Sequence, residues 1–187
     1  MNTATHPLAD VLGEAELLFG RAELDRVITR MGQRIDVALA GERPVLLTVM
    51  NGALIFAAQL ALAIHTDLEF DYVHATRYHG EMSGSEVQWL REPKVSLTDR
   101  VVLLVDDILD EGHTLKAIRE YCYAHGARRV LIASLCTKKH DRLIEGMASD
   151  FNGVELPDRF VFGYGMDYYE QGRNLPAIYA LKEDSAE

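Results

Sequence analysis

Residues 101–114, with the sequence VVLLVDDILDEGHT, constrain the fold of this chain most. The run opens with continuously apolar, mostly β-branched residues, a pattern typical of a central parallel strand that is covered on both faces. Acidic residues and a glycine follow directly. A helical pattern then runs from Thr114 to Ala124 and closes at Gly126, a glycine in the usual position after a helix. The segment therefore predicts a buried strand, a polar turn and a helix in direct succession.

Short apolar runs alternate with helical patterns along the rest of the chain. Such repeated units favour an α/β fold, a mostly parallel twisted sheet flanked by helices, which binds ligands beyond the carboxyl ends of its strands. The other predicted helices cover residues 15–40 and 55–65, and the other predicted strands cover residues 45–50, 70–76, 130–136 and 160–164.

Length and composition indicate a single domain at residues 1–187. The chain is 48% hydrophobic, enough for one substantial core, and shows no repeat, low-complexity stretch or linker. Its 19 basic against 29 acidic residues give a formal net charge of -10, which opposes binding to nucleic acid or to an anionic membrane. We therefore expect a small-molecule substrate, with neither nucleic acid nor membrane as a partner.

The chain shows no sign of export or of membrane insertion. No apolar run approaches the ~20 residues that span a bilayer, and the opening residues lack the basic start and apolar stretch of a signal peptide. These features predict a cytoplasmic protein. Cys122 lies in a helical pattern and Cys136 in a strand pattern, with no Cys-x-x-Cys pair, so both are expected to be interior thiols.

Two segments lack clear periodicity. Residues 1–14 contain Pro7 and are expected to be poorly ordered. Residues 77–94 are polar and glycine-bearing, and they are too long for a structureless connection without a function. We expect residues 77–94 to form a mobile loop at the active site.

The carboxylates and the glycine of residues 101–114 have the chemistry of a phosphate and metal site. A helix N-terminus attracts phosphate, Gly112 lets the backbone curl around it, and Thr114 adds a hydroxyl donor. Asp106 and Asp107 suit a ribose diol or Mg²⁺, which prefers oxygen ligands, and Asp110 then faces the reacting atoms. The alternative is that Asp110 caps the helix and the other two mark a polar strand end, but one cap does not need several carboxylates.

Other site signatures are absent from the sequence. No Gly-x-x-x-x-Gly-Lys-Ser/Thr motif occurs, and Gly163-x-Gly165 lacks the third glycine of a dinucleotide fingerprint because Tyr168 stands there. Three histidines match no zinc-binding spacing and are joined by no cysteine: His74, His79 and His113.

The strand, paired acids and turn into a helix resemble the PRPP (5-phosphoribosyl-1-diphosphate) motif of the type I phosphoribosyltransferases. Residues 160–181, FVFGYGMDYYEQGRNLPAIYAL, are similar to the C-terminal pattern of the hypoxanthine-guanine branch, and the resemblance extends over residues 45–181. It implies Mg²⁺-dependent transfer of 5-phosphoribosyl to N9 of hypoxanthine or guanine, which yields IMP or GMP and pyrophosphate in purine salvage. It also implies a small hood formed by the terminal segments and a homodimer or homotetramer.

The resemblance implies a role for each matching residue. Asp110 acts as the base near purine N7, and Tyr78 belongs to a lid that excludes water. Lys138 donates to the purine 6-oxo group, Phe160 stacks on the ring, and Val161 and Asp167 adjoin it. Magnesium is held by Asp106, Asp107 and Asp167. The residues that bind PRPP are Asp106, Asp107, Asp110, Glu111, Gly112, His113, Thr114, Asn51, Gly52 and Arg173.

Four positions depart from the family pattern, and one of them is Arg77, which precedes Tyr78 where a serine is frequent. Asn51, in Met50-Asn51-Gly52-Ala53, stands where a lysine or a small residue is common. Glu111 replaces a threonine or serine, so we expect its side chain to point away from the phosphate. His113 replaces a lysine or arginine, which predicts that PRPP affinity rises as the pH falls.

Several alternatives remain open from the sequence. Lys138 could belong to a solvated turn with Lys139, Phe160 could be core, and Asp167 could simply pair with Arg173. The enzyme could prefer xanthine. A nucleotide-sensing RNA-binding regulator on the same fold would need a basic face, which the scattered Lys and Arg residues do not predict.

Overall fold

The computed structural model describes residues 7–77 and 87–182. A six-stranded sheet with the order β4-β3-β2-β5-β6-β7 forms its centre. All neighbouring strands are parallel except β4, which pairs antiparallel with β3. The strands are β2 Val45–Met50, β3 Glu69–Arg77, β4 Val87–Arg91, β5 Val101–Leu109, β6 Arg129–Lys138 and β7 Phe151–Leu156.

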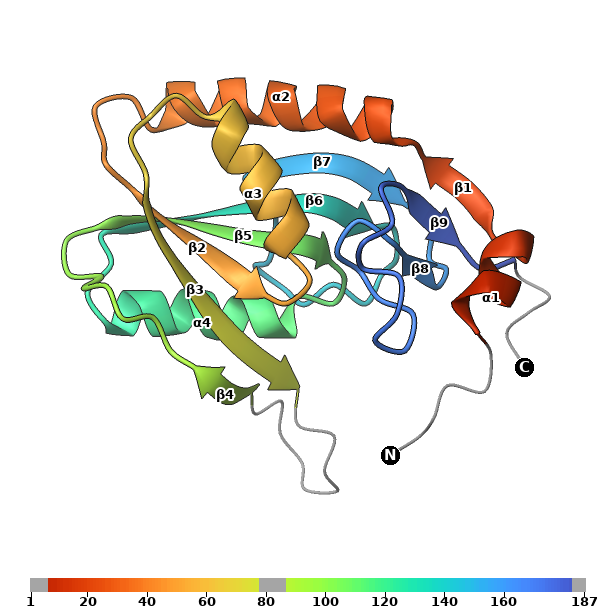
Figure 1. Ribbon diagram of the computed structural model, residues 1–187. Coiled ribbons are helices and arrows are strands. Elements are labelled where there is room, and N and C mark those ends of the chain that lie inside the picture. The colour runs from red at the N-terminus through yellow and green to blue at the C-terminus, as the bar shows by residue number, and fades with distance from the viewer. Residues whose placement is uncertain (1–6, 78–86, 183–187) are drawn as a thin grey trace.

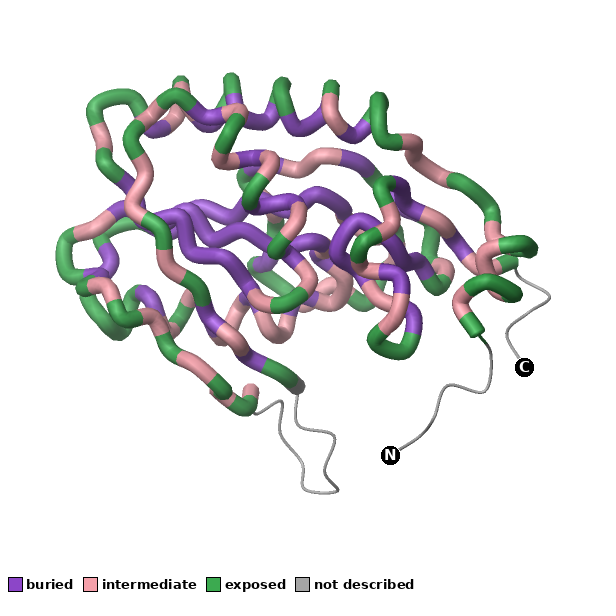
Figure 2. Tube along the Cα trace, viewed as in Figure 1, coloured by how far each residue is buried: buried purple, intermediate pink, exposed green. Residues whose placement is uncertain are grey.

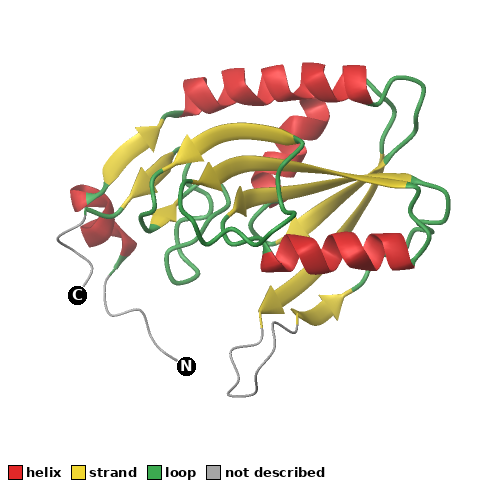
Figure 3. Cartoon of the chain, turned by 180° about the vertical axis from the view of Figure 1, so that it is seen from behind, coloured by secondary structure: helices red, strands yellow, loops and turns green. Residues whose placement is uncertain are grey.

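Helices cover both faces of this sheet (Figures 1 and 3). Helices α2 (Arg21–Ala38) and α3 (Leu54–Ala63) lie on one face, and α4 (His113–Ala124) lies on the other. The predicted α/β class and the mostly parallel sheet are therefore confirmed.

Strand β5 shows why a continuous apolar run encodes this architecture. Leu103 packs in the core with α2 and α3, while Leu104 packs in a second core with α4. Because successive side chains of a strand point to opposite faces, a strand covered on both sides must be apolar throughout. Figure 2 shows the resulting band of buried central strands.

The two ends of the chain build a small second sheet, which we call the hood. It is three-stranded, with the order β1-β9-β8, and all its pairs are antiparallel. Its strands are β1 Glu16–Phe19, β8 Val161–Phe162 and β9 Ile178–Ala180. The expectation of a hood formed by terminal segments is confirmed. We call residues 163–177, between β8 and β9, the hood loop.

Two sequence predictions in these terminal segments were wrong. The helix predicted at residues 15–40 starts only at Arg21, because the preceding residues form β1 and pair with β9. Residues 1–14 were predicted to be poorly ordered, but Leu8–Glu14 form helix α1, with Pro7 at the N-cap, while residues 1–6 lie outside the described residues. Proline fits the start of a helix because its missing N–H is not needed there. The Leu8 N–H donates to Gln171 Oε1 of the hood loop at 3.3 Å.

The prediction of a loop over residues 77–94 was also partly wrong. Arg77 ends β3, and Val87–Arg91 form the edge strand β4. Arg91 Nη2 lies 2.8 Å from Asp71 Oδ1, which fastens β4 to β3. The sequence pattern did not predict this short strand, because the strand depends on hydrogen bonds to β3 and not on its own residues alone. Residues 78–86, with Tyr78 and His79, lie outside the described residues.

Both cysteines are buried and free, as predicted. Burial raises the pKa of the Cys122 thiol to about 12 and that of Cys136 well above its ordinary value. In the part of the chain that the structure describes, no helix has the length and apolarity to cross a membrane.

Asp36 fastens helix α2 to the segment that follows α3. Its carboxylate accepts hydrogen bonds from the backbone N–H groups of His65 and Thr66 at 3.0 and 2.9 Å, and from the Thr66 hydroxyl at 2.9 Å. Although partial burial opposes the shift, these bonds lower the pKa of Asp36 to about 2.

Replacing Asp36 by alanine is expected to lower the free energy of unfolding at neutral pH by about 2 kcal/mol, the scale of hydrogen bonds to a charged group. Because the folded pKa lies below the unfolded value, this contribution is complete above that value and disappears as the pH falls from about 4 to about 2. Urea unfolding at several pH values measures it. Asp67→Ala, which removes an exposed pair with Arg43, is the control and should cost much less. Equal effects of the two substitutions would contradict the prediction.

Candidate active site

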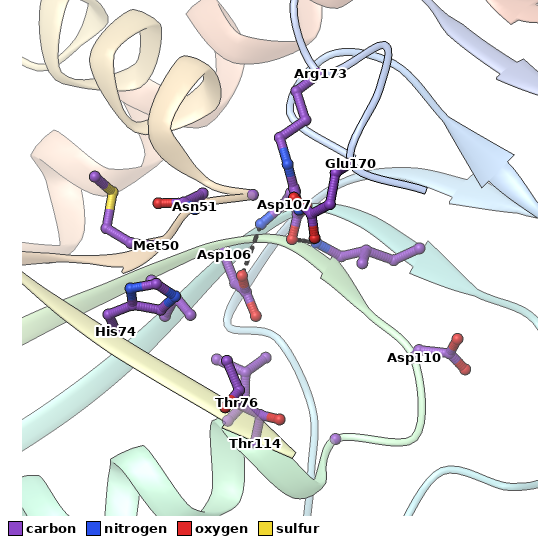
Figure 4. A pocket seen from close by; sticks show the side chains of 15 residues that line it. Met50, Asn51, His74, Thr76, Asp106, Asp107, Asp110, Thr114, Glu170 and Arg173 are labelled. Carbon is purple, nitrogen blue, oxygen red and sulfur yellow. Dashed lines mark hydrogen bonds and ion pairs between the residues drawn. The ribbon is translucent and has the colours of Figure 1, made fainter. Parts of the chain in front are cut away.

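A cavity of about 340 Å³ lies where β2, β3 and β5 end, beside the start of α4 and the hood loop. Figure 4 shows side chains from these elements converging on it. The predicted site residues that line it are Asn51, Gly52, Asp106, Asp107, Asp110, Gly112, Thr114 and Arg173. This is the position expected for a ligand site in a parallel α/β sheet.

The cavity also contains residues that sequence reasoning missed. His74 and Thr76 come from the end of β3, Met50 from the end of β2, and Glu170 from the hood loop. The sequence could have identified His74 and Thr76, because the strand at residues 70–76 was predicted and residues two apart on a strand face the same side. Nothing local marks Glu170, because only the folded hood loop brings it to the cavity.

Asp106 and Asp107 lie inside strand β5 rather than in a turn after it. Pairing with β6 continues through Ile108↔Cys136 and Leu109↔Thr137, so the strand is longer than its apolar run predicts. Both aspartates are only 9% exposed. Strand pairing therefore holds two carboxylates on the floor of the cavity.

Burial makes these two carboxylates unusual acids. It raises the pKa of Asp106 well above its ordinary value, and the charge of Asp107 raises it further. Burial also raises the pKa of Asp107, although the charge of Arg173 is among the effects that oppose this. Two buried oxygen donors of like charge fit a hard divalent cation such as Mg²⁺.

No group of three or more potential metal ligands of the His, Cys, Asp or Glu type converges within residues 7–77 and 87–182. Mg²⁺ at such a site commonly takes one or two carboxylates and completes its shell with water and substrate phosphate oxygens. Asp106 and Asp107 thus fit the cation as partial ligands, whereas the predicted third acid, Asp167, does not join them.

Asp110 sits between two donors, Lys138 at the end of β6 and His140 just after it. Lys138 Nζ lies 2.9 Å from Asp110 Oδ2, and His140 Nε2 lies 2.6 Å from Asp110 Oδ1. Although partial burial raises the pKa of Asp110, the bonds from Lys138 and His140 hold it below its ordinary value. Asp110 is therefore an oriented, ionised carboxylate at the edge of the cavity.

This geometry settles two of the alternatives. The N-cap of α4 is Gly112, without a side-chain cap, so Asp110 is not the helix cap. The Lys138 side chain is 15% exposed and bonded to Asp110, whereas the Lys139 side chain is 67% exposed and pairs with Glu155. Only the second lysine belongs to a solvated surface.

The start of α4 offers an anion site. Gly112 has a φ of 88°, a left-handed conformation that favours glycine. The first N–H groups of a helix have no partner within it, and Thr114 adds a hydroxyl beside the cavity. The carboxylate of Glu111 lies 3.8 Å from both Arg142 Nε and His113 Nε2. Neither Glu111 nor His113 lines the cavity, which agrees with an outward side chain at Glu111.

The loop after β2 and the hood loop approach each other closely over Asp107. The Met50–Asn51 peptide is cis. A Cβ added to Gly52 would lie 2.1 Å from Asp107 Oδ2, and one added to Gly165 would lie 2.0 Å from the Gly52 carbonyl oxygen. Both contacts require glycine, so backbone and carboxylate pack here without room for a methyl group.

Arg173 brings positive charge to the cavity from the hood loop. It lies 2.8 Å from Asp167 Oδ1 and 3.3 Å from Glu170 Oε2, and it donates to the Gly165 carbonyl oxygen at 2.9 Å. The alternative that Asp167 and Arg173 pair is therefore observed. Arg173 nevertheless lines the cavity, whereas Asp167 does not.

The residues predicted to contact a purine lie beside this cavity rather than in its wall. Phe160 is 46% exposed, so it is not core, while Val161 is buried at the start of β8. The Phe160 ring lies parallel to that of Tyr169, with centroids 6.5 Å apart. It also meets Tyr168 edge to face at 5.8 Å. An exposed aromatic face of this kind can stack on a planar ring.

Comparison with known proteins agrees with this geometry. The phosphoribosyl transferase domain model matches residues 15–169. A hypoxanthine-guanine phosphoribosyltransferase of Streptococcus pneumoniae is 34% identical over 170 residues, which cover 90% of this chain and 94% of that protein.

Solved structures agree as well. A hypoxanthine phosphoribosyltransferase of Staphylococcus aureus matches with a TM-score of 0.88 and 28% identity over 97% of this chain and 100% of that one. A hypoxanthine phosphoribosyltransferase of Trypanosoma cruzi, in complex with the product IMP, matches with a TM-score of 0.85 and 26% identity. That match covers 92% of this chain and 97% of the other.

Proposed function

Because this chain belongs to the phosphoribosyltransferase family, we propose that it transfers the 5-phosphoribosyl group of PRPP to N9 of hypoxanthine or guanine. The products are IMP or GMP and pyrophosphate, as in purine salvage. The observation that carries this proposal is the convergence of Asp106 and Asp107, the start of α4 and the ionised Asp110 on one cavity.

PRPP lies along the carboxyl ends of the strands. Its 5-phosphate binds the N-terminus of α4 at residues 111–114, where N–H groups and the helix dipole favour an anion. The ribose hydroxyls reach Asp106 and Asp107. The diphosphate extends toward Asn51, Gly52 and Arg173, whose guanidinium can bind phosphate oxygens in a forked geometry.

Mg²⁺ would be held by Asp106 and Asp107 together with oxygens of PRPP. When bound, it neutralises charge on the diphosphate and so makes it a better leaving group. Its charge would also favour the ionised form of both aspartates, whose pKa values burial raises. Asp167 pairs with Arg173 and does not line the cavity, so we do not include it among the magnesium ligands.

The purine lies between Asp110, Lys138 and Phe160. N9 attacks C1 of the ribose as the bond from C1 to the diphosphate oxygen breaks. Asp110 accepts the proton that the purine loses, at N7, and its charge stabilises positive charge that develops on the ribose. Lys138 donates to the 6-oxo group, an interaction that the amino group of adenine cannot replace. Phe160 stacks on the ring, and the Val161 backbone and Asp167 adjoin its edge.

Three further points belong to this proposal. Tyr78 closes over the reacting atoms as part of a lid. The two buried free thiols support a reducing compartment, and we propose the cytoplasm. The protein works as a homodimer or homotetramer.

The proposal is tested by incubating the protein with PRPP and Mg²⁺ and offering hypoxanthine, guanine, xanthine and adenine separately. We expect IMP and GMP to form fastest, adenine to react at least 10²-fold more slowly, and a chelator to abolish every reaction. Restored activity on adding Mg²⁺ back is the control. Faster turnover of xanthine would correct the substrate. Silence with all four bases despite PRPP binding would overturn the proposal and favour a regulator.

A further inference from the structure

His140 is a buried titratable residue that the mechanism above does not use. It follows β6 two residues after Lys138, and its side chain is 2% exposed. Its Nε2 atom lies 2.6 Å from Asp110 Oδ1, which makes the shorter of the two side-chain bonds to that carboxylate. A histidine so placed acts on the proposed base directly.

The hydrogen bonds assign the tautomer of His140. The backbone N–H of Arg142 donates to His140 Nδ1 at 3.1 Å, so Nδ1 carries a lone pair and no hydrogen. The ring proton is then on Nε2 and is donated to Asp110. His140 is therefore an uncharged donor of fixed orientation, because both ring nitrogens are engaged.

Apart from Lys138, the positively charged side chains near the His140–Asp110 hydrogen bond are engaged with other partners, so they do not take the place of His140 at the Asp110 carboxylate. Arg142 binds Asp158 through two bonds of 2.7 Å, which occupies its guanidinium. The carboxylate of Glu111 lies 3.8 Å from Arg142 Nε. Within residues 7–77 and 87–182, Lys138 and His140 are the only side chains that donate hydrogen bonds to Asp110.

Lys138 and His140, the two donors to Asp110, differ in whether they also bind the substrate. Under the proposed function, on which this inference rests, Lys138 must donate to the purine 6-oxo group, and its flexible ammonium then shares its bond to Asp110 Oδ2. His140 has no such second acceptor, since Arg142 already binds its other nitrogen. We propose that His140 is the positioning residue that keeps Asp110 oriented through Oδ1 while Oδ2 is released to the purine.

If His140 has this role, removing it should shift the pH dependence of the reaction in one direction. A hydrogen bond to the charged form of a carboxylate lowers its pKa, so removal of the His140 donor raises the pKa of Asp110. The base form would then be lost at a higher pH. The acidic limb of kcat/KM, which reports the free enzyme, is expected to move to higher pH.

The test compares two substitutions in the full-length protein. His140→Phe keeps a planar ring and removes the donor, whereas His140→Gln can place an amide N–H near the position of Nε2. We expect His140→Phe to lower kcat for IMP formation about 10²-fold, the scale of a misplaced catalytic group. It should also shift the acidic limb upward, and His140→Gln should restore most of both.

Two measurements on the free protein make the test independent of turnover, and the second of them does not need a folded variant. Carbon-13 NMR of the Asp110 carboxyl group should show titration at a higher pH in His140→Phe than in the wild type. Nitrogen-15 NMR of the unsubstituted protein should show the Nε2–H tautomer of His140. A charged or Nδ1–H ring would overturn the proposal, even if His140→Phe does not fold.

The remaining outcomes are also decisive. Loss of kcat in His140→Phe with an unchanged acidic limb and unchanged Asp110 titration would mean a structural role only and would overturn the proposal. If the wild type converts none of the bases, the proposed function fails, while the NMR titration still shows whether His140 controls Asp110.

Discussion

Replacing Asp110 by asparagine is expected to lower kcat for IMP formation by about 10²- to 10⁴-fold, the usual contribution of a general base. Asparagine has nearly the same size, so the site should keep its overall shape. Its one carbonyl oxygen can accept from only one of His140 and Lys138, and its NH2 group then faces the other donor. It cannot take a proton from the purine, and it removes the negative charge that faces the ribose. PRPP binding should change little, because the 5-phosphate and diphosphate contacts lie on other residues.

Steady-state kinetics with saturating PRPP and hypoxanthine measure this effect, and PRPP binding is followed separately by calorimetry. Asp141→Asn is the matched control, since Asp141 is an exposed neighbour of His140 that does not line the cavity. It should retain full activity. A kcat within a factor of three of wild type for Asp110→Asn would remove Asp110 from the mechanism.

Replacing Gly165 by alanine is expected to separate the hood loop from the loop after β2. The new methyl group would lie 2.0 Å from the Gly52 carbonyl oxygen, and the φ of 107° at this position strains any residue with a side chain. Because the obstacle is backbone, it cannot rotate away. We expect the free energy of unfolding to fall by about 3 kcal/mol. Displacement of Gly52 from Asp107 should lower kcat/KM for PRPP about 10²-fold.

Gly41→Ala is the control that separates the backbone strain of a left-handed residue from the steric clash with the Gly52 carbonyl oxygen. Gly41 also has a left-handed backbone, with a φ of 82°, but nothing lies within 4 Å of an added Cβ. This substitution should therefore cost about 1 kcal/mol and leave catalysis intact. Chemical denaturation and kcat/KM of both variants give the comparison. Gly165→Ala with wild-type kcat/KM would show that the two loops need not touch for catalysis.

The elements that the sequence predicted well are those whose pattern is long and local. Strand β5 and helix α4 follow from a continuous apolar run and a helical repeat, and β2 was predicted with its observed bounds. The type of fold follows from the alternation of such units. Strands β1, β4, β7 and β9 were missed because each is short or only partly apolar and takes its hydrogen bonds from a strand elsewhere in the chain.

For the site, the sequence alone determined the chemistry: paired acids on a strand, a third acid and a glycine before a helix. Only the tertiary structure decided which side chains meet. Strands β5 and β6 are parallel and place Leu109 opposite Thr137, so the ends of both strands and the residues just after them lie at the same edge of the sheet. Lys138 and His140 thereby reach Asp110, although they lie far from it in sequence. Strand register, which no local pattern encodes, sets the orientation and the lowered pKa of the proposed base.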